Sequence, residues 1–99
     1  MSSSVLDEHS AAHVAELFRA FSDPSRVRIM SALLSGEKNV NTLADLVGIS
    51  QSAVSHHMRG LRQMRLVMTR KNGKEVYYCE DDQHIIALFQ QGVRHIQEE

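Results

Sequence analysis

The sequence has a single cysteine, a single proline, no tryptophan and few aromatic residues among its 99 residues. One cysteine cannot form a disulfide or a Cys-x-x-Cys metal site within the chain. We expect Cys79 to be a small half-buried residue of a strand rather than a reactive thiol. The longest apolar run, residues 85–89, is far too short to span a bilayer, and the N-terminus lacks a signal-peptide pattern. These absences predict a cytoplasmic protein without a membrane partner.

Neither sign of charge dominates, since the formal net charge is −1, but the charges are segregated. Residues 51–74 contain six Lys and Arg residues and no acidic one, whereas six acidic residues follow between 75 and 99. A local excess of positive charge matters more for partners than the sum. At 99 residues we expect a flexible tail over 1–9 and one domain over 10–99. Such a domain is near the lower size limit for folding alone and often gains core by dimerising.

The stretch from Ser50 to Arg65 predicts a helix with two different faces. Val54, Met58 and Leu61 recur at helical spacing and form an apolar stripe. The outward face carries short polar side chains and then arginines: Ser52, Ser55, His56, Arg59 and Arg62. Such a face suits a DNA major groove, where phosphates set affinity and hydrogen bonds read the base edges. The alternative is a solvated surface helix that merely lacks acidic residues.

The segments before this helix predict a helix-turn-helix. Apolar residues at helical spacing predict a first helix over 11–21, and Asp23-Pro24 is a capping acid followed by proline at the start of a second. We expect Asn41 to cap a short third helix, from Thr42 to Val47. Gly48 then supplies the turn, and Ser50 caps the next helix. In this arrangement the second helix of the pair enters the groove.

The residues after Arg65 predict a β-hairpin. β-Branched and aromatic residues flank Asn72-Gly73, which is a strong signal for a two-residue hairpin loop. Arg70, Lys71 and Lys74 lie near the tip, where they could contact phosphates. The alternative is a hairpin with ordinary solubilising charges. The predicted fold is mainly α with a β-hairpin wing, a winged helix-turn-helix of order ααααββα that dimerises through its first and last helices.

The last predicted helix, from Asp81 to about Gln97, carries an apolar stripe and four potential metal ligands. The stripe is a natural subunit interface and comprises Ile85, Leu88, Phe89, Gly92, Val93 and Ile96. The potential ligands are Asp82, His84, His95 and Glu98. The alternative is that these four are polar residues beside a dimer seam, with Asp82 serving the helix dipole.

The spacing of the two histidines excludes a metal site within one straight helix. His84 and His95 share a face to within roughly 20°, but the rise between them is about 16 Å, whereas zinc ligands lie a few ångströms apart. Two antiparallel copies would bring the N-terminal pair of one chain to the C-terminal pair of the other. The spacing therefore predicts two equivalent sites per dimer. Asp82 must then sit at the helix cap or in an irregular first turn, because residues two apart face different ways.

Four segments together resemble the ArsR/SmtB family of metal-responsive repressors, and most of all its SmtB/CzrA-type zinc sensors. They are SDPSR (22–26), GISQSAVSHHMRGLR (48–62), RKNGKEVYY (70–78) and the Asp-x-His and His-x-x-Glu pairs between 82 and 98. The resemblance covers about residues 13–98. It implies that Gln51, Ser52, Ser55 and His56 contact DNA, and that the metal-free dimer represses. It also implies that the second ring nitrogen of His95 bonds a backbone carbonyl near Arg65.

The sequence also departs from part of the family. Cadmium, lead and arsenite sensors often carry cysteines near the third helix, where this chain has Asn39-Val40-Asn41. Nitrogen and oxygen ligands without sulfur favour Zn(II), with Co(II) as an alternative. Ni(II) would need further ligands, and His9 and His13 are the nearest candidates, although exposed histidine pairs are commonly incidental. We read His57 as a surface or packing residue.

The expected function is a homodimeric repressor that binds an inverted-repeat operator without metal and is released by Zn(II), which derepresses metal export or sequestration genes. The expected DNA contacts are Gln51, Ser52, Ser55, His56, Arg59, Lys71 and Lys74. One alternative is a winged-helix repressor with a vestigial metal site that answers another signal. A more distant one is a metal-dependent hydrolase, against which four protein ligands argue because they leave no open coordination position. We expect no catalytic residue and no small organic substrate.

Overall fold

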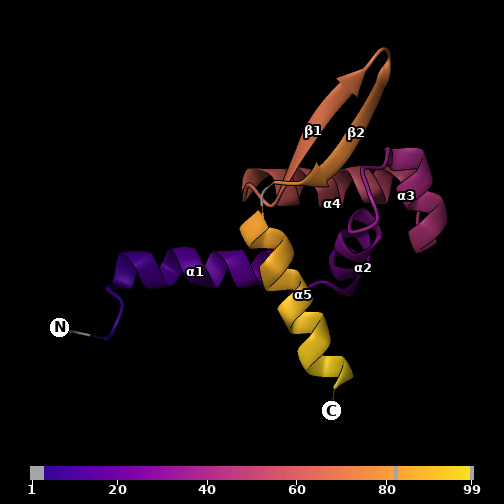
Figure 1. The fold of residues 1–99 in the computed structure, drawn as a ribbon. Coiled ribbons are helices and arrows are strands. Elements are labelled where there is room, and N and C mark those ends of the chain that lie inside the picture. Colours follow the sequence, from indigo (N-terminus) through magenta and orange to yellow (C-terminus); the bar gives the residue numbers. More distant parts are fainter. Residues whose placement is uncertain (1–3, 82, 99) are drawn as a thin grey trace.

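The computed structural model describes residues 4–81 and 83–98. The elements are α1 (Glu8–Ala20), α2 (Pro24–Leu33), α3 (Val40–Val47), α4 (Gln51–Gln63), β1 (Val67–Asn72), β2 (Glu75–Glu80) and α5 (Gln83–Gln97). The hairpin of β1 and β2 rises above α4, and α1 projects away from the other elements (Figure 1). The predicted winged helix-turn-helix and its element order are confirmed.

Side-chain caps decide where the first two helices begin. The Asp7 carboxylate accepts a hydrogen bond from the Ser10 N–H at 2.7 Å, so α1 begins at Glu8, inside the segment expected to be a tail. Asp23 caps α2 as predicted: its carboxylate accepts from the Ser25 N–H at 2.7 Å, and Pro24 is the first helical residue.

The helix-turn-helix is formed by α3 and α4, with one correction to its caps. The cap of α3 is Asn39, not Asn41, because the helix begins two residues earlier than expected and the Asn39 side chain accepts from the Thr42 N–H at 2.9 Å. Gly48 ends α3 with a φ of 78°, a left-handed conformation that glycine adopts without steric cost. Ser50 caps α4 as predicted, accepting from the Ala53 N–H at 3.0 Å.

The hairpin loop lies one residue later than predicted. The antiparallel register pairs Asn72 with Glu75, so the two loop residues are Gly73 and Lys74 rather than Asn72 and Gly73. Gly73 has a φ of 67°, and Lys74 is not among the residues with positive φ. This combination suits a turn with glycine at its first central position, which extends the ladder through Asn72. Lys38 pairs with Tyr78 as an isolated bridge beside β2, which ties the hairpin to the loop before α3.

The end of α4 contains Arg65, the one described non-glycine residue with positive φ, at 59°. The Leu66 N–H donates to the Leu61 carbonyl at 2.9 Å and the Arg65 N–H to the Arg62 carbonyl at 2.9 Å, which is the Schellman pattern of a helix end. A side chain in this left-handed conformation costs about 1 kcal/mol.

We therefore expect Arg65→Gly to raise the free energy of unfolding by about 1 kcal/mol, since glycine removes the steric cost at this position. Urea unfolding followed by circular dichroism measures the change. Gly48→Ala is the matched control at the other left-handed helix end and should lower stability by a similar amount. A destabilised Arg65→Gly variant would show that contacts of the arginine side chain outweigh the backbone strain.

The core lies between α2, α3, α4 and the start of β1. The predicted apolar stripe of α4 is confirmed, since Val54, Met58 and Leu61 have no exposed surface. The other buried residues are Ala20, Ile29, Met30, Leu33, Leu43, Ala44, Val47, Leu66, Val67 and Phe89. None of the described helices is both long and apolar enough to cross a membrane.

Candidate functional site

The outward face of α4 carries the side chains expected to contact DNA. Gln51, Ser52, His56 and Arg59 are exposed, and Ser55 is half-buried. The Gln51 amide donates to Asn41 on α3, so the first turn of α4 is fixed against its neighbour. Ser50 caps this end of α4, so the positive end of the helix dipole lies beside these polar side chains, which favours a phosphate.

A cleft of about 440 Å³ separates α4 from the hairpin. Ser55, Arg59, Arg62 and Gln63 of α4 line it, together with Tyr78 of β2. Two guanidinium groups and a phenol around one open cleft can hold an anionic oxygen. Tyr78 is a functional candidate that the sequence did not predict, because only the packing of the hairpin on α4 brings it beside the two arginines.

The three basic residues of the hairpin have different surroundings. Lys71 and Lys74 are exposed near the loop, where phosphate contacts were expected. The Arg70 guanidinium turns away from the loop, donates to both carboxylate oxygens of Glu37, and lies 5.6 Å from the centre of the Tyr77 ring. This hydrogen bonding lowers the pKa of Glu37, although partial desolvation opposes it. Arg70 is therefore paired with Glu37, whereas Lys71 and Lys74 are exposed.

Cys79 on β2 is half-buried, as the sequence predicts. Burial raises the pKa of its thiol, and the negative charges of Glu37 and Glu80 add to this effect. A raised pKa leaves less of the nucleophilic thiolate, which agrees with a packing residue.

The apolar face of α5 is divided between two neighbours. Ile85, Phe89 and Val93 pack on the core, and the Phe89 ring lies 6.2 Å from that of Phe21. Leu88, Gly92 and Ile96 instead line an apolar groove of about 590 Å³ beside the end of α1, together with Phe18, Phe21, Val27, Phe89 and Val93. The continuous stripe predicted from the sequence therefore serves both the protomer's core and an open groove.

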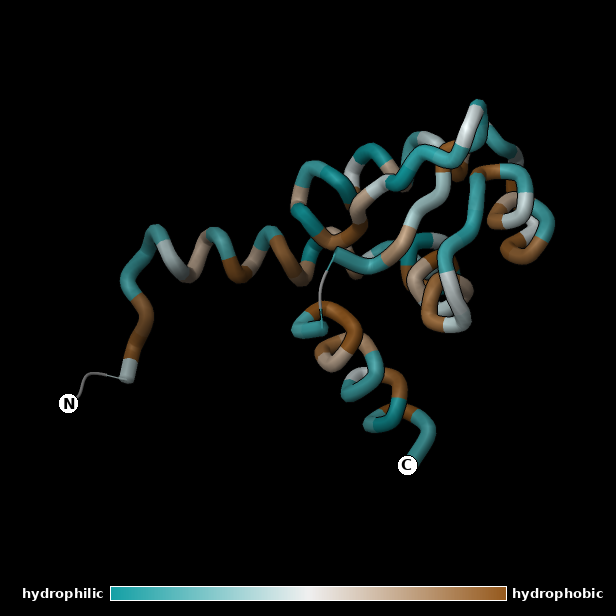
Figure 2. Tube along the Cα trace, turned by 45° about the horizontal axis from the view of Figure 1, so that its top comes forward, coloured by the Kyte–Doolittle hydropathy of each residue, from teal (hydrophilic) through white to brown (hydrophobic). Residues whose placement is uncertain are grey.

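The exposed apolar side chains of α1 extend this groove. Phe18 is 55% exposed and Val14 is 42% exposed, although both belong to the apolar residues whose helical spacing predicted this helix. Hydrophobic residues recur along α1 and α5 (Figure 2). The projection of α1 gives the molecule a long axis of 51 Å. Leu17, Ala20 and Phe21 pack on the core, whereas Val14 and Phe18 leave apolar surface of α1 exposed in the described part of the chain.

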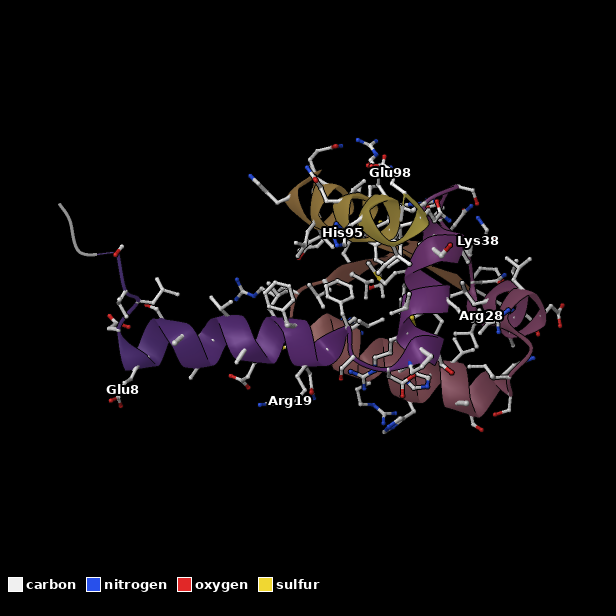
Figure 3. All side chains as sticks on the ribbon, turned by 90° about the horizontal axis from the view of Figure 1, so that it is seen from below. Glu8, Arg19, Arg28, Lys38, His95 and Glu98 are labelled. Atoms are coloured by element: carbon white, nitrogen blue, oxygen red, sulfur yellow. The ribbon has the colours of Figure 1, made fainter. Side chains whose placement is uncertain are left out.

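Three of the predicted metal ligands lie on α5 or directly after its last residue, within the described residues. His84, His95 and Glu98 are exposed, and Figure 3 shows His95 and Glu98 on the last turns of the helix. Arg94 lies 4.0 Å from the Glu98 carboxylate, an exposed and therefore weak ion pair. Asp82 lies outside the described residues. The helix begins at Gln83, so His84 belongs to its first turn.

Within residues 4–81 and 83–98, no three histidine, cysteine or acidic side chains lie close enough together to hold a metal ion. The regular α5 helix keeps its two histidines about three turns apart, as the spacing argument requires. The donor types, imidazole and carboxylate, are those that zinc accepts. The side chains of His84, His95 and Glu98 are exposed on the surface of the protomer.

A backbone hydrogen bond connects the start of the metal-ligand segment to the end of α4. The Asp81 N–H donates to the Leu66 carbonyl at 3.1 Å, directly after the Schellman turn at Arg65. Asp81 is followed by Asp82 and His84 in the sequence. A displacement of the first turn of α5 would therefore reach the C-terminal end of α4 through one hydrogen bond.

Comparison with known proteins gives a consistent assignment. Residues 23–69 match the family described as bacterial regulatory protein, arsR family. The chain is 45% identical over 94 residues to a transcriptional repressor SmtB homolog of Synechocystis sp., covering 95% of this chain and 71% of that protein. It is 40% identical over 86 residues to the cadmium resistance transcriptional regulatory protein CadC homolog of Staphylococcus aureus, covering 86% of this chain and 71% of that protein.

A solved structure agrees with the fold. The homodimeric winged helix-turn-helix DNA-binding domain Mb0332 of Mycobacterium bovis, a possible ArsR-family transcriptional regulator, superposes with a TM-score of 0.82. It is 25% identical, and the match covers 99% of this chain and 92% of that one.

Proposed function

This chain belongs to the arsR family of bacterial regulatory proteins, and on that basis we propose that zinc controls its binding to DNA. The family assignment makes it a DNA-binding transcriptional repressor of the winged helix-turn-helix type with a homodimeric fold. Its relatives are transcriptional regulators, so it is not an enzyme and the hydrolase alternative is wrong. In the proposal, the metal-free dimer occupies an inverted-repeat operator in the cytoplasm and represses metal export or sequestration genes.

The observation that carries the metal assignment is the symmetric spacing of the four ligands in the sequence, about the middle of the helix that also lines the apolar groove. Asp82 and Glu98 are centred on Gln90, and His84 and His95 are centred between Phe89 and Gln90. Two antiparallel α5 helices that cross near Gln90 would therefore bring both pairs together about one two-fold axis. Leu88, Gly92 and Ile96 lie on the same stretch of the helix and supply the apolar contact.

Four residues would then hold each of two zinc ions: Asp82 and His84 from one protomer, and His95 and Glu98 from the other. Bound zinc would supply a strong, directional attraction between two chain segments that otherwise meet only through apolar contact. Four protein ligands complete its coordination, as in sites that organise a fold rather than catalyse. Because no thiolate takes part, we propose Zn(II), with Co(II) able to replace it. One relative is named for cadmium resistance, and that name describes the relative alone.

DNA would be contacted by the exposed face of α4 and by the hairpin. Ser52, Ser55 and His56 are suited to base edges, Gln51 joins them at the start of the helix, and Arg59, Lys71 and Lys74 are suited to phosphates. Zinc bound at α5 would favour a dimer geometry in which the two α4 helices no longer fit successive major grooves. The hydrogen bond from Asp81 to Leu66 gives a direct connection for this change. By thermodynamic linkage, bound DNA must lower the affinity for zinc by the same factor by which bound zinc lowers the affinity for DNA.

The test is fluorescence anisotropy of the protein on a labelled duplex from its own promoter, first with a chelator and then with added zinc. We expect tight binding with the chelator and a loss of at least about fivefold in affinity with zinc, the lower range of allosteric coupling. His84→Ala should bind DNA equally well and ignore zinc. His13→Ala, an exposed histidine on α1, is the matched control and should respond like the unmodified protein.

Each other outcome changes a specific part of the proposal. Zinc-independent DNA binding, together with a dimer that binds no zinc, would leave a repressor whose metal site is vestigial. Tighter DNA binding with zinc would reverse the direction of control. A zinc response that persists in His84→Ala and disappears in His13→Ala would move the site to the N-terminal helix.

A further inference from the structure

A cationic side chain outside the helix-turn-helix lies against the middle of α4. The Arg26 Nε, from the first turns of α2, donates to the His57 Nδ1 at 3.2 Å. The end of the same guanidinium lies over Gly60: a Cβ built on Gly60 would be 2.6 Å from Nη2 and 2.9 Å from Cζ of Arg26. The guanidinium therefore crosses α4 where that helix has no side chain.

Gly60, where Arg26 lies against α4, is at the edge of the outward face of this helix. Gly60 comes one turn after His56 and directly follows Arg59, both exposed and both expected at DNA. His57, which the sequence suggested is a surface or packing residue, is half-buried and serves as the acceptor for Arg26. The arginine head thus lies beside the DNA-reading surface rather than in the core.

Among the described residues, the charge of Arg26 is offset only in part, by electrostatic attraction to the carboxylate of Asp23. The nearby Asp23 carboxylate accepts from the backbone N–H groups of Ser25 at 2.7 Å and Arg26 at 3.3 Å, so it caps α2. In the part of the chain that the structure describes, the guanidinium of Arg26 donates one hydrogen bond, from Nε to His57. The two terminal nitrogens keep their N–H groups for an external acceptor.

Arginine side chains therefore border the outward face of α4 on both sides. Arg59 and Arg62 line the cleft toward the hairpin, whereas Arg26 lies over Gly60, on the side of His57. A recognition helix in a major groove lies between two phosphate backbones. Phosphate contacts on both walls would fix the helix in the groove.

We propose that Arg26 binds a backbone phosphate of the operator DNA. His57 positions the Arg26 guanidinium, and the lack of a side chain at Gly60 leaves room for it. This inference rests on the DNA-binding function. It assigns the contact to α2, outside the helix-turn-helix and the wing. The ligand is a phosphodiester, so the contact carries no base preference.

Arg26→Gln is expected to weaken binding roughly tenfold and to lower the slope of log affinity against log salt by about two, one phosphate for each protomer. The loss should be similar on promoter DNA and on a random duplex of equal length. Arg28→Gln is the matched control: Arg28 is two residues away on α2, but its Nη1 donates to the Val47 carbonyl at 2.7 Å and its side chain points toward α3 (Figure 3). It should keep the full slope.

Gly60→Ala provides a second, independent variant that retains the arginine. Its Cβ displaces the guanidinium, so it should reproduce the lower slope, and adding it to Arg26→Gln should cause little further loss. Weaker binding with an unchanged slope would give Arg26 a packing role and overturn the proposal, as would a loss confined to promoter DNA. Failure of the unmodified protein to bind either duplex would instead refute the DNA-binding function itself.

Discussion

Mixing His84→Ala chains with His95→Ala chains is expected to restore zinc binding that neither variant has alone. Each proposed site takes His84 from one protomer and His95 from the other. Each variant homodimer therefore loses one histidine from both of its sites. A mixed dimer has one site that lacks both histidines and one that is intact. Loss of a direct ligand should lower the affinity for zinc by at least about 100-fold, more than loss of a hydrogen bond that supports a ligand does.

Random pairing makes half of the dimers mixed, so the mixture should bind tightly about one zinc ion for every two dimers. Competition with a fluorescent zinc chelator, after the chains are unfolded together and refolded, measures this number. His13→Ala mixed with His95→Ala is the control. Its mixed dimers also keep one complete site, while its His13→Ala homodimers keep two, so the tight sites should be about twice as many. If mixing restores nothing, each site is built within a single chain and the proposed dimer geometry is wrong.

Ile96→Glu is expected to convert the protein to a monomer and to abolish tight operator binding. Ile96 is 65% exposed in the protomer, so the substitution costs the isolated chain little. In the proposed dimer the same side chain is covered by the partner, and each interface would bury two carboxylates without a counter-charge. We expect the dissociation constant of the dimer to rise at least about 100-fold, which corresponds to roughly 2.7 kcal/mol.

Sedimentation velocity gives the oligomeric state. Fluorescence anisotropy on an inverted-repeat duplex gives the loss of DNA affinity when the two DNA-binding domains are no longer joined. Leu46→Glu is the matched control, because Leu46 is also apolar and 54% exposed but lies on α3, outside the groove. It should remain a dimer. A dimeric Ile96→Glu variant would place the subunit interface on another surface.

Much of the fold could be predicted because its signals are local. Asp23-Pro24, Gly48 and Ser50 mark helix ends through their own backbone and side-chain chemistry, and the structure has helix ends at these places. The stripe of Val54, Met58 and Leu61 is buried as helical periodicity requires. The errors were also local: Asn39 and Asn41 are equally good caps by residue type, and the loop shifted because glycine takes the first position of the turn.

The metal-ligand spacing is a further property that the sequence determines. A regular helix has a fixed rise per residue, so the distance between His84 and His95 follows from their numbers and excludes a site that uses both histidines of one straight helix. The proposed ligands include no thiolate, and this residue chemistry is the reason for proposing Zn(II) or Co(II).

The tertiary structure decided the contacts between segments distant in the sequence. Arg26 and His57 are 31 residues apart, and Arg70 and Glu37 are 33 apart, yet each pair meets through a side-chain hydrogen bond. Tyr78 joins Arg59 and Arg62 only because the hairpin packs beside α4. Sequence periodicity also could not divide the α5 stripe between the core and the open groove. Periodicity reports which residues share a helix face, whereas the neighbour that covers this face is set by how the helices pack together.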